Sequence, residues 1–379
     1  MSDTKHAILS PSSAARWTNC PGSVALCKDI PNTTSEYAEE GTYAHAIAAA
    51  DLTRSPRPGP IDREQHDYIK AYTTAVEAAA QGKFLLVEQR LPISRWTGEA
   101  DAKGTADAII IDAKNATVEV WDLKFGQGHV VIAENNEQLM LYALGVLGIV
   151  EGIFLDKVTV VKLVIHQPRR DHISEWCVDR QTLIDFGEKA SQAGLIALAA
   201  RDSLTSPDNL LHPSEKACLW CPAKATCPAL AAKVQSEVFD DFDTVDIAKP
   251  KQISASNLPS AEVLTLVEEW IKAAKAKISE QLNNRIPVPG WKLTLGRQGN
   301  RTWSDGGKVE ELVKAMRIKD AFIHELKSPA QIEKLIPPKK FKKLADLITR
   351  ADAKPIPVPS SDPRPEYVPA TEGEFNAFI

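Results

Sequence analysis

Residues 104–125, GTADAIIIDAKNATVEVWDLKF, hold two runs of residues that favour β-strands. Gly104–Ile111 and Thr117–Phe125 are rich in β-branched and aromatic residues. The segment between them, Asp112-Ala-Lys-Asn115, is of the kind that forms turns. Two such runs joined by a short turn predict a β-hairpin, which we take as the centre of the fold.

The sequence on both sides of the hairpin alternates between helical and extended patterns. Residues 8–27 read as a capped helix with Trp17 as a buried anchor, ended by Cys20-Pro21. Further helices are expected at 35–53, 61–81, 134–150 and 181–201, and further strands at 83–91 and 157–166. The order helix, three strands, helix, strand predicts an α/β core with a mixed sheet flanked by helices.

Composition changes after this core. Residues 1–235 form the expected core domain, and 236–260 read as a linker. Residues 261–350 predict a small helical and basic C-terminal module, and 351–379 a Pro-rich disordered tail.

Charge and hydropathy limit the class of protein. The 379-residue chain has a formal net charge of −5, which argues weakly against a protein that coats nucleic acid. It shows no run of ~20 apolar residues and no secretory signal pattern. These features predict a cytoplasmic protein with no membrane partner. In that reducing compartment, spaced cysteines indicate metal ligands rather than disulfides.

The hairpin carries the candidate catalytic residues. Asp122 and Lys124 lie two residues apart, so strand alternation places both on one face, and Asp107 can approach Asp122 across the hairpin. Two close carboxylates repel unless a cation separates them, which favours Mg²⁺ or Mn²⁺. Lys124 would orient the attacking water or neutralise the transition state. For Asp-x-Lys alone, an ordinary surface pair is the better interpretation.

Further polar residues extend this set. Gln138 and Tyr142 share one face of the helix after the hairpin, because they are four residues apart. His45 lies upstream on an expected helix and could complete a metal shell. Taken singly, His45 also reads as a packed histidine and Tyr142 as a core aromatic.

Taken in order, His45, Gly104-x-x-Asp107, Asp122-x-Lys124 and Gln138-x-x-x-Tyr142 resemble the RecB-type branch of the PD-(D/E)xK nucleases, over residues 8–230. The resemblance implies a restriction-endonuclease-like fold. It implies that His45, Asp107 and Asp122 bind Mg²⁺ or Mn²⁺, that Lys124 is the catalytic lysine, and that Gln138 and Tyr142 position substrate. Glu88 is a further candidate acidic ligand.

Four cysteines form a second constellation: Cys218, Cys221 and Cys227 are closely spaced, and Cys20 lies far upstream. The same nuclease branch includes members with a [4Fe–4S] cluster on one N-terminal cysteine and a C-terminal Cys-x2-Cys-x5-Cys. The resemblance therefore implies an iron–sulfur cluster, which would join the two ends of the core. Zinc is the alternative, since it also accepts four thiolates. Cys27 and Cys177 are interpreted as plain buried residues.

The chain also resembles an uncharacterised family encoded in phages and prophages. The similarity includes Leu9-Ser-Pro-Ser-Ser13, Cys20-Pro-Gly-Ser23 and Pro289-Gly-Trp-Lys-Leu293. It implies a role in phage DNA replication or recombination in a bacterial host. The expected partners are DNA ends or single strands, with replication or recombination proteins docking on the tail.

Three functions follow from these patterns. The first is a metal-dependent deoxyribonuclease, acting as an exonuclease or on ends and single strands. The second is a non-catalytic DNA-binding scaffold that keeps the nuclease fold. The third is a zinc-stapled adaptor that acts through its C-terminal part.

Overall fold

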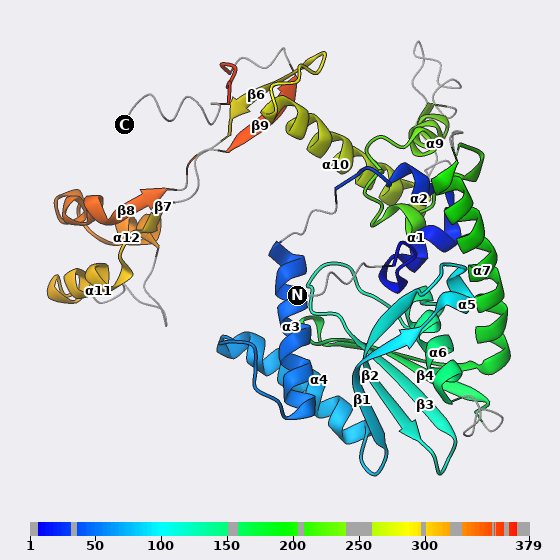
Figure 1. Cartoon of the computed structure of the whole chain (residues 1–379). Helices are drawn as coiled ribbons and strands as arrows, with labels where there is room; N and C mark the ends of the chain where they lie inside the picture. Colours follow the sequence, from blue (N-terminus) through cyan, green and yellow to red (C-terminus); the bar gives the residue numbers. More distant parts are fainter. Residues whose placement is uncertain are drawn as a thin grey trace, which may run out of the picture. The chain divides into compact units, whose positions relative to one another are not determined.

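The computed structural model describes residues 7–31, 36–150, 158–203, 208–239, 260–296, 301–318, 328–350, 352, 354–359 and 364–369 (Figure 1). The chain divides into two compact units, Met1–Ile271 and Lys272–Ile379. The first unit holds every candidate site residue, including the cysteines. None of the helices in these described ranges is sufficiently long and apolar to traverse a membrane.

A five-stranded mixed sheet forms the centre of the first unit. Its strands, in spatial order, are β1 (Phe84–Pro92), β2 (Lys103–Asp112), β3 (Thr117–Leu123), β4 (Val160–Gln167) and β5 (His172–Asp179). All neighbouring pairs are antiparallel except β3 and β4, which are parallel. The β2–β3 pair confirms the predicted hairpin. Its register runs from Asp112↔Thr117 to Ala108↔Trp121.

Helices cover both faces of this sheet. The helices of the core are α3 (Glu36–Thr53), α4 (Arg63–Ala79), α6 (Glu137–Val150) and α7 (Arg180–Asp202). One apolar cluster joins α6 and α7 to strand residues such as Val120. Another joins α3 and α4 to strand residues such as Trp121 and Leu123. Strand alternation along β3 therefore separates two cores, and the predicted α/β fold with a mixed, helix-flanked sheet is confirmed.

The N-terminal segment packs on α7. It consists of η1 (Pro11–Ser13), α1 (Ala14–Asn19) and α2 (Gly22–Leu26), and it ends its first helix at Cys20 as predicted. Trp17 is fully buried, and its indole Nε1 donates a hydrogen bond to the Ser10 carbonyl at 3.1 Å. The serine hydroxyls do not cap these helices. Instead the Ser10 hydroxyl lies 3.1 Å from that of Ser12 and 2.9 Å from that of Ser13.

The remaining elements of the first unit include α5 (Ser94–Thr97), η3 (Pro168–Arg170), η4 (Asp208–Leu210), α8 (Glu215–Cys218) and α9 (Pro228–Phe239). Helix α10 (Ala261–Asn283) crosses the boundary between the units. Strand β5 was not predicted. Its residues alternate between exposed and half-buried, because it is an edge strand with charged and polar side chains on one side.

The second unit contains short helices and two small sheets. Its elements are β6 (Trp291–Leu295), β7 (Arg301–Trp303), α11 (Gly306–Ala315), α12 (Pro329–Leu335), α13 (Pro338–Phe341), η6 (Lys342–Leu347), β8 (Ile348–Arg350) and β9 (Pro355–Pro359). Strand β9 pairs antiparallel with β6. The expectation of a disordered tail from residue 351 is therefore wrong for Pro355–Pro359, because their backbone pairs with β6. Linker residues 240–259 and tail residues 370–379 lie outside the described residues.

Candidate active site

Three potential metal ligands from separate elements meet beside the hairpin. One ligand atom each of His45 (α3), Glu88 (β1) and Asp107 (β2) lies within 4.8 Å of the others. One imidazole and two carboxylates form a donor set that suits Mg²⁺ or Mn²⁺. The side chains His45 and Asp107 are partly buried, so an ion held here would remain reachable from solvent.

Backbone conformation brings Glu88 into this set. Glu88 has φ of +49°, in the left-handed region that glutamate rarely adopts. The β1–β2 ladder pairs Val87 with Ala108 and Gln89 with Ala106, but it leaves out Glu88 and Asp107. The interruption thus falls where the two carboxylates face each other. Such an unusual conformation inside a strand points to a functional constraint.

Asp107 connects the site to the sheet. Its Oδ1 accepts a hydrogen bond from Nδ1 of His45 at 3.0 Å, and its Oδ2 accepts one from the backbone N–H of Leu123 at 2.7 Å. Burial opposes the charged imidazole, but the Asp107 hydrogen bond and the charges of Asp107 and Asp122 outweigh it. The pKa of His45 is therefore raised. For Glu88, partial burial and the Asp107 charge also raise the pKa.

On the α6 side, Lys124 lies between two acceptors. Its Nζ lies 2.7 Å from Oδ2 of Asp122 and 2.9 Å from Oε1 of Gln138, to which it donates. Nε2 of Gln138 donates to Oδ1 of Asp122 at 3.0 Å and to the hydroxyl of Tyr142 at 3.1 Å. The four side chains predicted from the hairpin and from α6 are thus brought together in one network.

Burial controls the charge of this network. Asp122 is buried, which raises its pKa; Lys124 opposes that rise and the nearby Asp107 charge adds to it. Burial and then the charge of Asp122 raise the pKa of Tyr142, so its phenol stays neutral. Because Tyr142 accepts from Gln138, its own hydroxyl hydrogen remains to be donated.

Tyr72 is a site residue that the sequence analysis missed. This α4 side chain lines the same recess as His45, Glu88 and Asp107, and its hydroxyl is buried without a hydrogen-bond partner. Burial, followed by the charges of Asp107, Asp122 and Glu88, raises its pKa, so it stays a neutral donor. An unpartnered buried hydroxyl costs free energy, so this hydroxyl is a candidate donor to a ligand of the metal-binding set. Within α4 nothing in the sequence distinguishes Tyr72 from an ordinary core aromatic.

The carboxylates therefore fall into two groups. His45 and Asp107 meet with Glu88, the ligand that the sequence proposed least firmly. Asp122, which the resemblance placed among the metal ligands, contacts Lys124 and Gln138 instead. Asp107 and Asp122 remain close enough for the charge of one to affect the other.

Three of the four predicted cluster cysteines share one apolar core. Cys20, Cys218 and Cys227 are buried together with Leu230 and Leu266, and Cys221 is also buried. Burial raises the pKa of Cys20 and of Cys218, and the charge of Cys227 adds to both shifts. Buried thiols of this kind lose their protons to a metal, so the donor set fits a thiolate-bound cluster.

The spacing of the sulfur atoms bears on the type of metal. A tetrahedral zinc ion with Zn–S bonds of about 2.3 Å needs sulfurs about 3.8 Å apart. Among the described residues, no three cysteine sulfurs lie within 4.8 Å of one another. Cys27, which the sequence placed outside the cluster, has its Sγ 3.9 Å from that of Cys221. The expectation that Cys177 is buried is wrong, since it is exposed on edge strand β5.

The arginines after β4 have structural partners. Arg169 forms an ion pair with Glu40 of α3 at 2.9 Å, and its guanidinium lies 5.1 Å from the centre of the Phe125 ring. Arg170 donates to the carbonyls of Gln127 and Gly128. These contacts hold α3 and the segment after β3 in place, so we assign neither arginine to phosphate binding.

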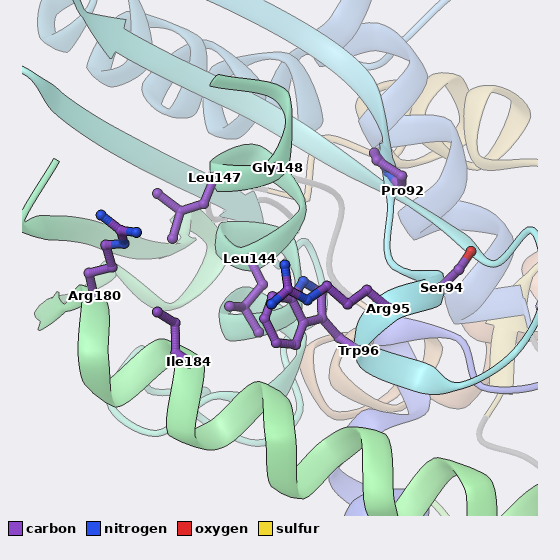
Figure 2. Close-up of a pocket in the computed structure, with 9 residues that line it drawn as sticks. All are labelled: Pro92, Ser94, Arg95, Trp96, Leu144, Leu147, Gly148, Arg180 and Ile184. Atoms are coloured by element: carbon purple, nitrogen blue, oxygen red, sulfur yellow. The ribbon is translucent and has the colours of Figure 1, made fainter. Parts of the chain in front are cut away.

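A hollow of about 350 Å³ lies apart from these residues, between α5, α6 and α7 (Figure 2). Its lining includes Arg95, Trp96, Leu144 and Arg180 and none of the metal-binding set. The Arg95 guanidinium lies over the Trp96 ring, 4.5 Å from its centre (Figure 2). The hollow therefore carries no catalytic group of this site.

The sequence was also compared with known families and structures. A family model described as "Protein of unknown function (DUF2800)" matches residues 6–365. The chain belongs to the DUF2800 family. The crystal structure of SSO0001 matches with 18% identity over 60% of this chain and 89% of that one, with a TM-score of 0.27. The crystal structure of LHK-Exo in complex with dAMP matches with 13% identity over 50% of this chain and 90% of that one, with a TM-score of 0.22.

We expect Mn²⁺ to bind at His45, Glu88 and Asp107. Asp107→Asn and Glu88→Gln each remove a charged oxygen ligand, and each should weaken Mn²⁺ binding by about 10–100-fold, measured by electron paramagnetic resonance titration. Asp67→Asn, which alters an exposed carboxylate on α4, is the matched control and should leave the affinity unchanged. Wild-type affinity in both site variants would remove the assignment.

Proposed function

We propose that this protein is a metal-dependent deoxyribonuclease that hydrolyses phosphodiester bonds. The observation that carries the proposal is the placement of a lysine ammonium, Lys124, in one network beside a histidine–carboxylate set. Phosphodiester hydrolysis needs charge neutralisation at the phosphate and an activated water. The two halves of this site supply residues for both tasks.

The metal half consists of His45, Glu88 and Asp107, with the Tyr72 hydroxyl in the same recess. A bound Mg²⁺ or Mn²⁺ would supply an acidified water and positive charge for the phosphate. Nδ1 of His45 donates a hydrogen bond to Asp107, so metal binding competes with protonation of this pair. The family resemblance implies that Asp122 binds the metal directly. From its contact with Lys124 we propose instead that Asp122 holds the Lys124 ammonium in place beside the metal.

Lys124 and Tyr142 form the substrate half. An ammonium has three donors, and two of those of Lys124 face Asp122 and Gln138, so the third can approach a phosphate oxygen or the attacking water. Tyr142 keeps its hydroxyl hydrogen for a phosphate oxygen. Gln138 contacts Asp122, Lys124 and Tyr142, so it fixes the geometry of all three.

We assign Cys20, Cys218, Cys221 and Cys227 to a [4Fe–4S] cluster with a structural role, and zinc remains the alternative occupant. Burial of all four thiols and the likeness of their spacing in the sequence to that of the cluster-bearing nuclease branch support this assignment. The cluster would join the N-terminal segment to the end of the core domain. Cys27 lies beside Cys221 and would border the cluster.

The proposed setting is the cytoplasm of a bacterial host, in phage DNA replication or recombination. The substrates would be DNA ends or single strands, processed in the manner of RecB-type nucleases. These assignments depend on the sequence resemblance and on the site chemistry together. Proteins that bind the C-terminal tail are part of the same proposal.

Removal of the lysine should stop cleavage. Lys124→Ala should lower kcat on end-labelled single-stranded DNA by about 10²–10³-fold, because it removes a charge aimed at the phosphate. Lys114→Ala is the matched control, since it removes an exposed lysine from the turn of the same hairpin. Cleavage at the wild-type rate by Lys124→Ala would contradict the proposal. DNA binding without cleavage by the wild type under either metal would favour a non-catalytic scaffold.

The cluster should be visible in anaerobically purified protein. We expect a brown protein with about four iron atoms and matching sulfide per chain, lost in Cys218→Ala because one thiolate ligand is absent. Cys177→Ala changes an exposed cysteine and should keep the colour. Stoichiometric zinc without iron or sulfide would overturn the cluster and favour the zinc alternative.

A further inference from the structure

An exposed tryptophan lies between two of the proposed cluster ligands. Trp220, in Cys218-Leu-Trp-Cys221, has 73% of its surface exposed, although large aromatic side chains usually contribute to a core. Its ring meets the ring of His129 edge to face, with 5.9 Å between centroids and 83° between planes. The contact holds Trp220 in place while most of the ring stays open to solvent.

A groove with basic and hydroxyl-bearing walls starts at this ring. It has a volume of about 370 Å³, and its polar lining consists of Ser10, Ser12, Ser13, Arg16, Cys27 and Lys216, with Trp220 and Pro222 beside them. No aspartate or glutamate lines it. The serine hydroxyls cap no helix: they contact one another, and that of Ser13 also donates to the Ser10 carbonyl, so those of Ser10 and Ser12 can turn to an incoming acceptor.

The groove adjoins the substrate half of the active site. Lys216 forms an ion pair with Glu137 at 2.7 Å, and Glu137 directly precedes Gln138 on α6. Pro11, beside these serines, packs with the ring of Tyr142 against Gly104; a Cβ at Gly104 would lie 2.6 Å from Pro11 and 2.9 Å from Tyr142. His129 lies in the segment that follows Lys124.

We propose that this groove binds one nucleotide of a single-stranded DNA next to the cleaved bond, with the base stacked on Trp220 and the phosphate near Arg16 and Lys216. The inference rests on the proposed function and names its substrate form. An open aromatic face beside two cations and three hydroxyls matches an unpaired base and its phosphate. A duplex keeps its bases stacked on one another and offers this ring no face.

The hollow between α5, α6 and α7 lacks this property. Trp96 also lies in a wall of that hollow, next to Arg95, and Arg180 lies apart from it in the same lining (Figure 2). However, the Arg95 guanidinium covers its ring, and the ring packs partly into the core. A base could not stack there without displacing Arg95. The open ring therefore distinguishes the Trp220 groove as the nucleotide site.

The test measures, by fluorescence anisotropy, how tightly the full chain binds labelled oligothymidine. EDTA is present, so no cleavage occurs. Trp220→Ala should weaken binding by about 5–150-fold, the equivalent of one lost stacking contact of 1–3 kcal/mol. Trp220→Phe keeps an aromatic face and should stay within about threefold of the wild type. Phe84→Ala, which removes another exposed aromatic, should have no effect.

Two further arms separate the sources of binding. Lys216→Gln should lower the slope of log affinity against log salt concentration by about one, because one cation is lost. The preference for an unpaired base should remain. Duplex DNA of the same length should bind Trp220→Ala as well as it binds the wild type. Unchanged single-strand affinity in Trp220→Ala overturns the inference, and so does an equal loss for single strands and duplex.

The assay also separates this inference from the nuclease proposal. A chain that binds single strands through Trp220 but cuts no DNA with Mg²⁺ or Mn²⁺ leaves the groove assigned and removes the proposed activity. If Trp220→Ala cuts DNA with a wild-type KM, the nuclease activity stands and the groove is not the nucleotide site. The iron content of each Trp220 variant, compared with the wild type, shows whether the neighbouring cysteines keep their cluster.

Discussion

The position of the Asp107 carboxylate is the constraint on which the rest of the site depends. One oxygen accepts the backbone N–H of Leu123, and the other accepts the imidazole of His45 from α3. The last β2–β3 pair is Ala108↔Trp121. Beyond it, the Leu123 N–H bonds to the Asp107 side chain, so the regular pairing of the two strands ends there. Lys124 directly follows Leu123, three residues beyond the last residue of β3 that pairs with β2. The metal-binding set and the lysine are thus fixed by one carboxylate.

The candidate site takes its residues from both faces of the sheet. Residues on the α3 and α4 side supply His45 and Tyr72, and α6 on the other side supplies Gln138 and Tyr142. The strand ends lie between these layers, so a phosphate placed there would meet metal from one side and the lysine from the other. Desolvation and the charge of Asp107 raise the pKa of Glu88, which makes an unneutralised pair of acids at Glu88 and Asp107 costly. A divalent cation relieves that cost.

Local patterns predicted much of the fold. The hairpin, its turn and the helices on both sides have strong periodicity, and the alternation of Asp122 and Lys124 with Trp121 followed directly from it. Strand β5 was missed because an edge strand has no continuous apolar face. Strand β9 was missed because its prolines indicate an extended tail, although a proline at an edge can still pair.

Fixed spacings along one element predicted part of the site, while Asp107 came from the pairing of the two hairpin strands and His45 from the family resemblance. Gln138 and Tyr142 contact each other because residues four apart lie on one face of a helix, and Gln138 in turn contacts Lys124. Glu88 depended on a left-handed φ, and Tyr72 on the packing of α4 against the sheet, and neither is encoded in a local pattern. Trp220 lay in a motif that was interpreted through its cysteines, so its exposed ring emerged only from the structure.

A crystal grown with Mn²⁺ and analysed at the manganese absorption edge tests the central claim most directly. The account predicts an anomalous peak within bonding distance, about 2.0–2.3 Å, of His45, Glu88 or Asp107, with the Lys124 ammonium beside the ion and not bound to it. An Mn²⁺ peak elsewhere in the chain, with these three side chains free of metal at saturating Mn²⁺, would contradict it.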